Sequence, residues 1–345
     1  MGNPKENTRR SVTTSEIARL CGVSRTTVSA VLNGKRNVRE STRGKILECI
    51  RAHNYDAGMI SRSLVGELSH MVAVLTTDLT NPFNMAVFRG IDHVLGGQGY
   101  HILFHKVWNQ RDRDPEMLAS LQSCRPAGYI VLKGAEGPHG EYAGSIMAEG
   151  VPLVALGDMK TIECHSVRYE KRAAIGLATD HVIEAGHRRI AHLAGPAGTS
   201  GAKERQLGFV ESLVTHDLHV SESVIEDAGE TAMDGYNAAL KIFGDPARRP
   251  TAVVCFNDMV ALGAYRAAHE LSINIPGELS ITGFDCLDFT DLLGPPLTTV
   301  DIHAQQLGQR MADLLLKVIR GEVGEEKVTE WVEPALVVRG SVRRL

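Results

Sequence analysis

The sequence predicts two fold classes in succession: a small all-helical N-terminal domain, then an α/β region of two doubly wound parallel sheets. The chain has 345 residues, which exceeds one ordinary domain. Residues 1–66 hold 12 Lys and Arg against 5 Asp and Glu, whereas the remaining residues hold 25 against 36. The hydrophobic spacing is helical up to about residue 53, and from residue 71 short apolar runs alternate with longer amphipathic stretches.

The first two helices are expected within residues 13–33. Thr13 and Glu16 have the spacing of a capping box, in which a Ser or Thr precedes a Glu by three residues. Gly22 makes the tight connection, and Ser24 is the expected N-cap of the second helix. Two short amphipathic helices joined by a Gly-containing turn are typical of a helix-turn-helix. A third helix is expected at about residues 40–53.

The second helix has one apolar and one polar face. Its inward positions are Val28, Val31 and Leu32, and its outward positions are Arg25, Thr26, Ser29 and Ala30. The alternative is a helical hairpin that merely packs on another part of the chain. The positive charge confined to this end argues against that alternative and favours a polyanionic partner, nucleic acid above all.

Three segments follow from the pattern: a helical domain at 1–56 with a basic arm at 1–12, a linker at 57–67, and the α/β region at 68–345. The linker is too short to be a stable helix on its own. Two readings of it stay open: a flexible connection, or a helix that orders only when it meets DNA and a second copy of the chain.

The α/β region shows regular alternation of strands and helices. Strands are expected at 71–76, 100–105, 128–132, 152–156, 189–194, 251–256 and 279–282. Helices are expected at 82–97, 115–124, 142–149, 171–185, 202–213, 233–242, 259–271 and 304–319. This alternation predicts parallel sheets with helices on both faces. A region of this length favours two lobes over one sheet.

Composition limits the class of protein. The six cysteines contain no CxxC pair, so neither a disulfide framework nor a zinc site is expected. No apolar run approaches the roughly 20 residues that span a bilayer, and the polar start of the chain is no secretory signal. We therefore expect a soluble cytoplasmic protein without membrane contact.

An enzyme is the main alternative function, because doubly wound sheets host many catalysts. The glycines at 96–99 precede a strand, which is opposite to a dinucleotide-binding turn. His187 and His192 lack a third-ligand pattern and are more often packing residues. We assign no catalytic residue, cofactor or metal ion. A cytosolic small-molecule-binding protein without DNA binding is a second alternative.

Short motifs along almost the whole chain match one known family in order. In the helical domain the matching motifs are Ile17-Ala18, Gly22-Val23-Ser24, Thr27-Val28-Ser29 and Val31-Leu32-Asn33, and in the linker Arg62-Ser63-Leu64. In the α/β region they include Asn81-Pro82-Phe83, Gly186-His187-Arg188-Arg189-Ile190, Asn257-Asp258-Met259 and Ile281-Thr282-Gly283-Phe284-Asp285. Many ordered matches are far more specific than any one of them. On these motifs the chain resembles the lactose-repressor (LacI/GalR) family of bacterial transcriptional regulators.

This resemblance implies a homodimer whose two heads read a pseudo-palindromic double-stranded DNA operator, each with a recognition helix in the major groove. The DNA-binding residues that it implies are Thr13, Ser24, Arg25, Thr26, Thr27, Ser29, Ala30, Asn33, Arg62 and Leu64. Leu64 matches the leucine that wedges into the minor groove. The linker departs from the family pattern at Ala57-Gly58 and Ser61, and Ala30 stands where many members carry Arg.

The resemblance also implies a periplasmic-binding-protein-like body that holds a small-molecule effector, a sugar or sugar derivative, between its lobes. The positions that match family ligand contacts are Phe83, Arg205, Asn257 and Asp285. Asp258 is open to a different reading, as a helix cap with a purely structural role. Glu230 stands where many members place an aromatic residue, which leaves open a regulator with a vestigial cleft.

Overall fold

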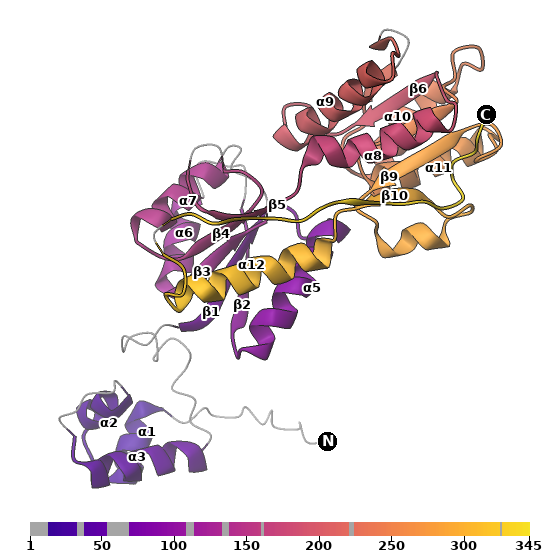
Figure 1. Ribbon diagram of the computed structural model, residues 1–345. Coiled ribbons are helices and arrows are strands. Elements are labelled where there is room, and N and C mark those ends of the chain that lie inside the picture. The colour runs from indigo at the N-terminus through magenta and orange to yellow at the C-terminus, as the bar shows by residue number, and fades with distance from the viewer. Residues whose placement is uncertain are drawn as a thin grey trace, which may run out of the picture. The chain divides into compact units, whose positions relative to one another are not determined.

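The computed structural model describes residues 13–32, 38–53, 69–107, 114–132, 138–159, 162–220, 224–324 and 326–345 (Figure 1). The expected arm at 1–12, the linker at 57–67 with Arg62 and Leu64, and Asn33 lie outside the described residues. No helix in the described ranges is long and apolar enough to cross a membrane.

The head consists of α1 (Thr14–Cys21), α2 (Arg25–Leu32) and α3 (Glu40–Ala52). Thr13 caps α1 in a complete capping box with Glu16. Gly22 ends α1 with a φ of 66°, a left-handed conformation that Gly adopts without strain. Ser24 Oγ accepts a hydrogen bond from the Thr27 amide at 3.1 Å, as an N-cap of α2 does. The predicted caps, turn and third helix are confirmed.

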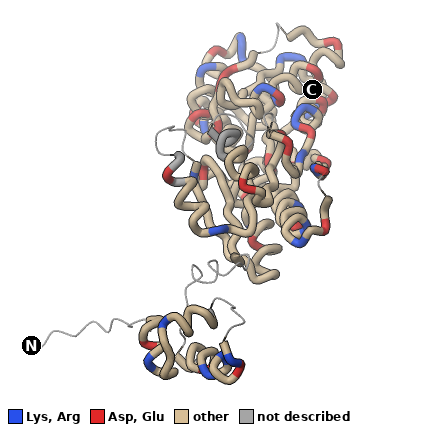
Figure 2. The backbone as a smooth tube through the Cα atoms, turned by 90° about the vertical axis from the view of Figure 1, so that its left-hand side faces the viewer, with Lys and Arg blue, Asp and Glu red and all other residues tan. Residues whose placement is uncertain are grey.

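The core of the head is small and is shared by all three helices. Ile17, Val28 and Ile46 are fully buried in it. On the opposite face of α2, Arg25 and Thr26 are exposed. Val28 and Val31 of the predicted inward face are buried, whereas Ser29 and Ala30 of the predicted outward face are half-buried, so the outward face is confirmed only for Arg25 and Thr26. Figure 2 shows more basic than acidic positions on these helices.

The first lobe of the body is a six-stranded sheet in the order β11-β5-β4-β3-β1-β2. Its strands are β1 (Ser69–Thr76), β2 (His101–Lys106), β3 (Pro126–Val131), β4 (Leu153–Leu156), β5 (His165–Arg168) and β11 (Thr329–Trp331). Three helices lie between its strands β1 and β4 in the sequence: α5 (Pro82–Gly97), α6 (Asp114–Ser123) and α7 (Pro138–Ala148). A later helix, α12 (Ala304–Ile319), packs on α5. Strands β3, β4, β5 and β11 pair in parallel.

The second lobe is a six-stranded sheet in the order β12-β10-β9-β8-β6-β7. Its strands are β6 (Ile190–Ala194), β7 (Val224–Asp227), β8 (Ala252–Cys255), β9 (Ser280–Phe284), β10 (Thr298–Asp301) and β12 (Ala335–Val337). Among the described residues of this sheet, β12 pairs antiparallel with β10, and the other neighbouring strands pair in parallel. The helices are α8 (Lys171–Glu184), α9 (Ser200–Thr215), α10 (Ala232–Phe243) and α11 (Asp258–Glu270), with the 3-10 helix η2 (Asp288–Leu292).

The chain passes between the lobes three times: from β5 to α8, from β10 to α12, and from β11 to β12 (Figure 1). Each of the seven predicted strands and eight predicted body helices is present, with bounds shifted by a few residues at most. The predicted fold class, two doubly wound lobes behind a helical head, is confirmed. Strands β5, β7, β10, β11 and β12 were not predicted.

Helix α12 crosses α5 with its backbone in direct contact. A Cβ atom at Gly308 would lie 1.9 Å from the carbonyl oxygen of Val87, and one at Gly90 would lie 2.0 Å from that of Gln305. No side chain fits at such distances, so these two glycines set the separation of the helices.

Candidate functional site

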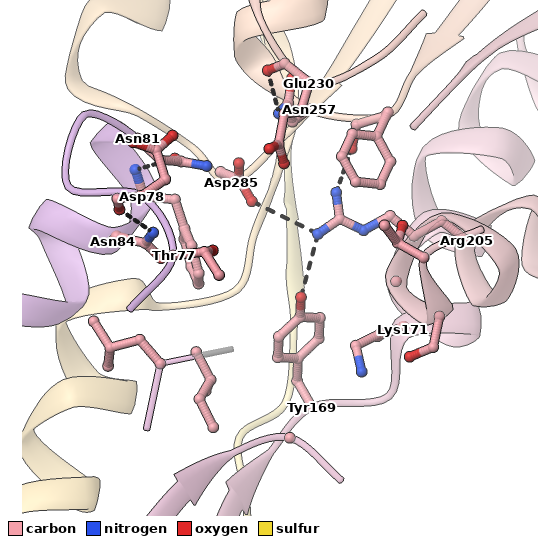
Figure 3. Close-up of a pocket in the computed structure, with 18 of the residues that line it drawn as sticks. Thr77, Asp78, Asn81, Asn84, Tyr169, Lys171, Arg205, Glu230, Asn257 and Asp285 are labelled. Carbon is pink, nitrogen blue, oxygen red and sulfur yellow. Dashed lines mark hydrogen bonds and ion pairs between the residues drawn. The ribbon is translucent and has the colours of Figure 1, made fainter. Parts of the chain in front are cut away.

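A cavity of about 550 Å³ lies between the two lobes of the body (Figure 3). It is at the ends of β1, β5, β8 and β9, where the carboxyl edges of doubly wound sheets hold ligands. All four residues predicted to contact an effector line it: Phe83, Arg205, Asn257 and Asp285. The structure therefore brings together four positions that lie far apart in the sequence.

Arg205 projects from α9 and is only 7% exposed. Its guanidinium carbon lies 3.8 Å from the ring centre of Phe284 and 4.3 Å from that of Phe256. Nη1 donates to the backbone carbonyl of Phe256, and Nη2 donates to the hydroxyl of Tyr169 at 3.3 Å. The two aromatic faces and these acceptors hold the planar donor group in one orientation.

Asp285 follows β9 and is also only 7% exposed. Its nearest cation is Arg205, whose Nη2 lies 4.0 Å from Oδ1, beyond a normal hydrogen bond. Burial raises the pKa of the Asp285 carboxyl to about 8; Arg205 opposes this shift, and the charges of Asp258 and Glu230 add to it. Its φ of 108° is strained for a residue other than Gly.

Asn257 ends β8 and serves as the N-cap of α11. Its Oδ1 accepts from the Val260 amide at 2.8 Å, and its Nδ2 donates to the backbone carbonyl of Glu230 at 3.1 Å. The amide therefore holds the start of α11 and the loop of Glu230 at the cavity wall. Phe83 is placed in a similar way, because Asn81 caps α5 by accepting from the Phe83 amide at 2.9 Å.

Asp258 has a structural role, but it is not the helix cap that the sequence suggested, because Asn257 caps α11. Asp258 is fully buried and does not line the cavity. Its Oδ2 accepts from the Leu287 amide at 2.8 Å and its Oδ1 accepts from the Thr299 hydroxyl at 2.6 Å. Burial raises its pKa to about 7 even though these hydrogen bonds oppose the shift. Asp258 thus fixes the segment that follows Asp285.

Sequence reasoning missed several polar lining residues, among them Tyr169 and Lys171. Both follow β5, a strand that was not predicted, so nothing in the sequence pattern marked a strand end there. Tyr169 lies where the chain first crosses between the lobes, and burial raises its pKa. The acidic side chains on the wall are Asp78, Asp158, Glu230 and Asp285.

The two histidines considered as ligands are packing residues. His192 stacks on Phe209 at 5.0 Å, and its Nδ1 is 2.8 Å from the Val254 carbonyl. His187 Nδ1 is 3.0 Å from the Thr251 hydroxyl, within the same lobe. In the part of the chain that the structure describes, no group of three His, Cys, Asp or Glu side chains is arranged to hold a metal ion.

On the head, the residues predicted to contact DNA fall into distinct environments. Thr13 and Ser24 are occupied as helix caps, and the Ser24 hydroxyl lies 2.6 Å from that of Thr26 and 2.8 Å from that of Thr27. Arg25 is exposed beside them. The remaining described members of the set, Ser29 and Ala30, are half-buried.

Comparison with protein families covers both parts of the chain. Residues 13–57 match the bacterial regulatory proteins of the lacI family, and residues 179–342 match the periplasmic binding protein-like domain. The HTH-type transcriptional repressor PurR of Vibrio cholerae serotype O1 (strain M66-2) is 30% identical over 336 residues, which cover 96% of this chain and 98% of that protein. The chain belongs to the LacI family of bacterial regulatory proteins. These relatives are transcriptional repressors, not enzymes.

Solved structures agree with this membership of the LacI family. A lac repressor dimer bound to operator and the anti-inducer ONPF is 25% identical, with a TM-score of 0.79 over 97% of this chain and all of that one. The CelR–cellobiose complex is 25% identical, with a TM-score of 0.71 over 95% and 99%. A LacI-family regulator from Enterococcus faecium with bound ribose is 25% identical, with a TM-score of 0.72 over 80% and 99%.

Proposed function

We propose that this chain is a sequence-specific repressor that binds a pseudo-palindromic operator as a homodimer and answers to a small neutral sugar or sugar derivative. The observation that carries the proposal is Asp285: a carboxyl 93% buried, in a strained backbone, facing a cavity between two lobes without a hydrogen-bonded cation. Burying such a carboxyl destabilises the empty protein, and a ligand that donates a hydrogen bond to it removes part of that unfavourable free energy.

In this proposal the head at 1–56 reads DNA with α2. Arg25 makes a bidentate contact to guanine worth about 1–3 kcal/mol. Thr26 and Ala30 adjoin the base edges, and the hydroxyls of Thr27 and Ser29 hold the phosphate backbone. The operator-bound lac repressor dimer supports this arrangement by similarity.

The hinge at 57–67 completes the operator contact in this proposal. Arg62 and Leu64 lie in the minor groove, where Leu64 opens a base step at a cost of a few kcal/mol that the extra contacts of bent DNA offset. The body at 68–345 holds the effector and the second copy of the chain.

The charge of the cavity wall favours an uncharged effector. Four carboxyl groups face two cations there, and one of those cations, Arg205, already lies against Asp285. A phosphate ester or a sugar acid would meet net repulsion. A ring with adjacent hydroxyls instead matches the donor fork of Arg205 and the acceptor oxygens of Asp285. Bound ribose and cellobiose in similar proteins support this class by analogy.

Glu230 stands where many family members have an aromatic residue, so we expect the effector of this protein to differ from a ligand that stacks on an aromatic ring at that position. Its charge contributes to the raised pKa of Asp285, so the two carboxyl groups are close enough to interact. A ligand hydroxyl or amino group that donates to both relieves this repulsion, whereas a bare apolar ring face does not. We therefore expect the ligand ring to stack on Phe83 of the first lobe.

Binding changes DNA affinity through lobe closure. A ligand that contacts Phe83 in one lobe and Asp285 in the other bridges the cavity and stabilises the closed arrangement by its differential affinity for the two states. Tyr169 contributes to this coupling because it lies on the first crossing between the lobes and its hydroxyl accepts a hydrogen bond from Arg205. The crossing segments then carry the change of lobe angle toward the hinge.

The DNA half of the proposal is tested by selecting bound duplexes from a random pool with the full chain. We expect a palindromic consensus, and we expect Arg25→Ala to relax preference at one symmetric base pair while leaving bulk-DNA affinity nearly unchanged. Leu64→Ala is expected to lessen operator bending in a gel-mobility assay. Equal loss on all sequences for Arg25→Ala would refute its reading role.

The effector half is tested by thermal unfolding with ribose, glucose, cellobiose, glucosamine and glucose 6-phosphate. A true ligand raises Tm by mass action, by about 2.7 kcal/mol of stability at one hundred times its Kd. Asp285→Asn is expected to abolish the shift, and Asp158→Asn, at an exposed part of the wall, is expected to retain it. No shift with any sugar, or a shift with the phosphate ester alone, would overturn the neutral-sugar assignment.

A further inference from the structure

Two cysteines of the head, Cys21 and Cys49, come together in its core although they are separated by 28 positions in the sequence. Cys21 is the last residue of α1 and is buried. Cys49 lies in the last part of α3 and packs against the same core cluster as Ile17 and Ile46. The sequence predicted no disulfide framework from these spacings, and it gave no sign that these two thiols meet.

The geometry directs both sulfur atoms at one turn of α3. Cys21 Sγ lies 3.9 Å from the carbonyl oxygen of Lys45. Lys45 is four residues before Cys49, so the Cys49 amide bonds to that same carbonyl in the helix. Helical side chains lean toward the N-terminus, which brings the Cys49 thiol back over the turn of Lys45. Burial raises the pKa of the Cys21 thiol, and the neighbouring Cys49 adds to this shift, in keeping with the position of both residues in the same core cluster.

The two thiols differ in access. Cys49 is half-buried, and its Sγ lies 3.8 Å from Nδ1 of His53, one turn further along α3. Cys21 is 3% exposed. An oxidant therefore reaches Cys49 before it reaches Cys21. Cys21 is then positioned as the resolving thiol behind it.

We propose that Cys21 and Cys49 form a reversible disulfide when the head meets a hydroperoxide, and that this bond weakens operator binding. The Cys49 thiol gives its proton to solvent and its sulfur attacks one peroxide oxygen. The O–O bond breaks, the leaving hydroxide takes up a proton from solvent, and a sulfenic acid and one water form. The Cys21 sulfur then attacks the Cys49 sulfur, the S–O bond breaks, and the hydroxyl leaves as a second water with the Cys21 proton. The sulfurs lose two electrons together, and one hydrogen peroxide is reduced to two waters.

The consequence for DNA binding follows from what adjoins Cys21. A disulfide draws the sulfurs to about 2.05 Å, which pulls the end of α1 toward α3. Gly22 follows directly, and the Val23 amide bonds to the Ala18 carbonyl at 3.0 Å to set the turn into α2. A displaced turn re-aims α2 and its exposed Arg25. This second half rests on the proposed function of α2 as the reading helix.

The chemical half is tested on the full-length protein with hydrogen peroxide and then N-ethylmaleimide. We expect loss of two hydrogen masses, a linked peptide pair containing Cys21 and Cys49, and full reversal by dithiothreitol. Cys49→Ser is expected to abolish the link, while Cys124→Ser, at another half-buried thiol, leaves it unchanged. Alkylation of both thiols after peroxide, a link between other cysteines, or a link between two chains overturns the proposal.

The regulatory half is tested by operator affinity of the oxidised protein, on the duplex recovered by selection. We expect about tenfold weaker binding, restored by dithiothreitol and absent in Cys49→Ser. Unchanged affinity with the disulfide fully formed overturns this half. If the reduced protein binds no duplex, the proposed function fails, and peptide mapping still decides whether the disulfide forms.

Discussion

Replacing Asp285 with Asn is predicted to stabilise the empty protein while it removes effector binding. Asn has nearly the same shape as Asp, and both tolerate the left-handed backbone region better than other residues with side chains, so the φ of 108° adds no new cost. The substitution changes one property: the group no longer ionises.

The magnitude follows from the pKa of Asp285, which burial raises from its ordinary value of 3.8 to about 8. The folded state holds the proton more tightly than the unfolded chain, so the unfolded chain loses it first as the pH rises. The stability contributed by this group is therefore complete below pH 3.8 and is lost progressively up to pH 8. Each pH unit in this interval lowers the free energy of unfolding by about 1.4 kcal/mol, so the loss over the whole interval is on the order of 5 kcal/mol.

The assay is urea unfolding of wild type and Asp285→Asn at pH 4.5, 6, 7 and 8, without added sugar. We expect the smallest difference at pH 4.5 and a steady divergence, with the variant more stable at pH 8. The difference between them cancels the titration of groups that do not interact with Asp285, whereas Asp258 and Glu230 do interact with it. An Asn variant that is less stable than wild type at pH 8 would refute the account of Asp285 as a strained binding group.

Two further substitutions test the packing and the capping described above, both in the full chain. Gly308→Ala is predicted to lower the free energy of unfolding by about 3 kcal/mol or more, because its Cβ would lie 1.9 Å from the Val87 carbonyl oxygen. The control is Gly96→Ala, whose Cβ meets no atom within 4 Å and which is expected to be neutral or slightly stabilising. Urea unfolding measures both. Thr13→Ala is predicted to lower the stability of α1 by about 1 kcal/mol, because the Glu16 amide loses the hydroxyl that accepts its hydrogen bond. We expect faster hydrogen exchange of that amide in Thr13→Ala and retained protection in Thr13→Ser. Equal exchange in the Ala and Ser variants would contradict the capping role.

The elements that the sequence predicted share a strong local signal. The strands at 128–132 and 251–256 are apolar runs buried on both faces, and the structure has β3 and β8 there. The strands that were missed lack that signal for physical reasons. β7 and β11 are short edge strands with exposed residues, and β5, four residues long, begins with His and ends with Arg.

The candidate site divides in the same way. Arg205 and Asp285 were predicted because they match motifs of a known family, and both line the cavity. Tyr169 was missed with the strand that precedes it. The engagement of the Asn257 side chain with Glu230 was not predictable, because it depends on a loop contact 27 residues away in the sequence. The local sequence pattern predicts which residues follow a strand, whereas the contacts of those residues with distant parts of the chain are known only from the structure.

The last seventeen residues of the chain have a consequence for synthesis and engineering. They add an edge strand to each lobe, β11 to one and β12 to the other, and then seal the second lobe with Ser341, whose hydroxyl bonds to the Ile281 carbonyl and the Thr298 amide. On the ribosome, the first lobe lacks its edge strand until residue 331 has emerged, and the second lobe lacks the Ser341 contacts until residue 341 has emerged. A stop codon near residue 325 would damage both halves at once, and grafting a sensor module between homologues requires matched cuts at all three crossings.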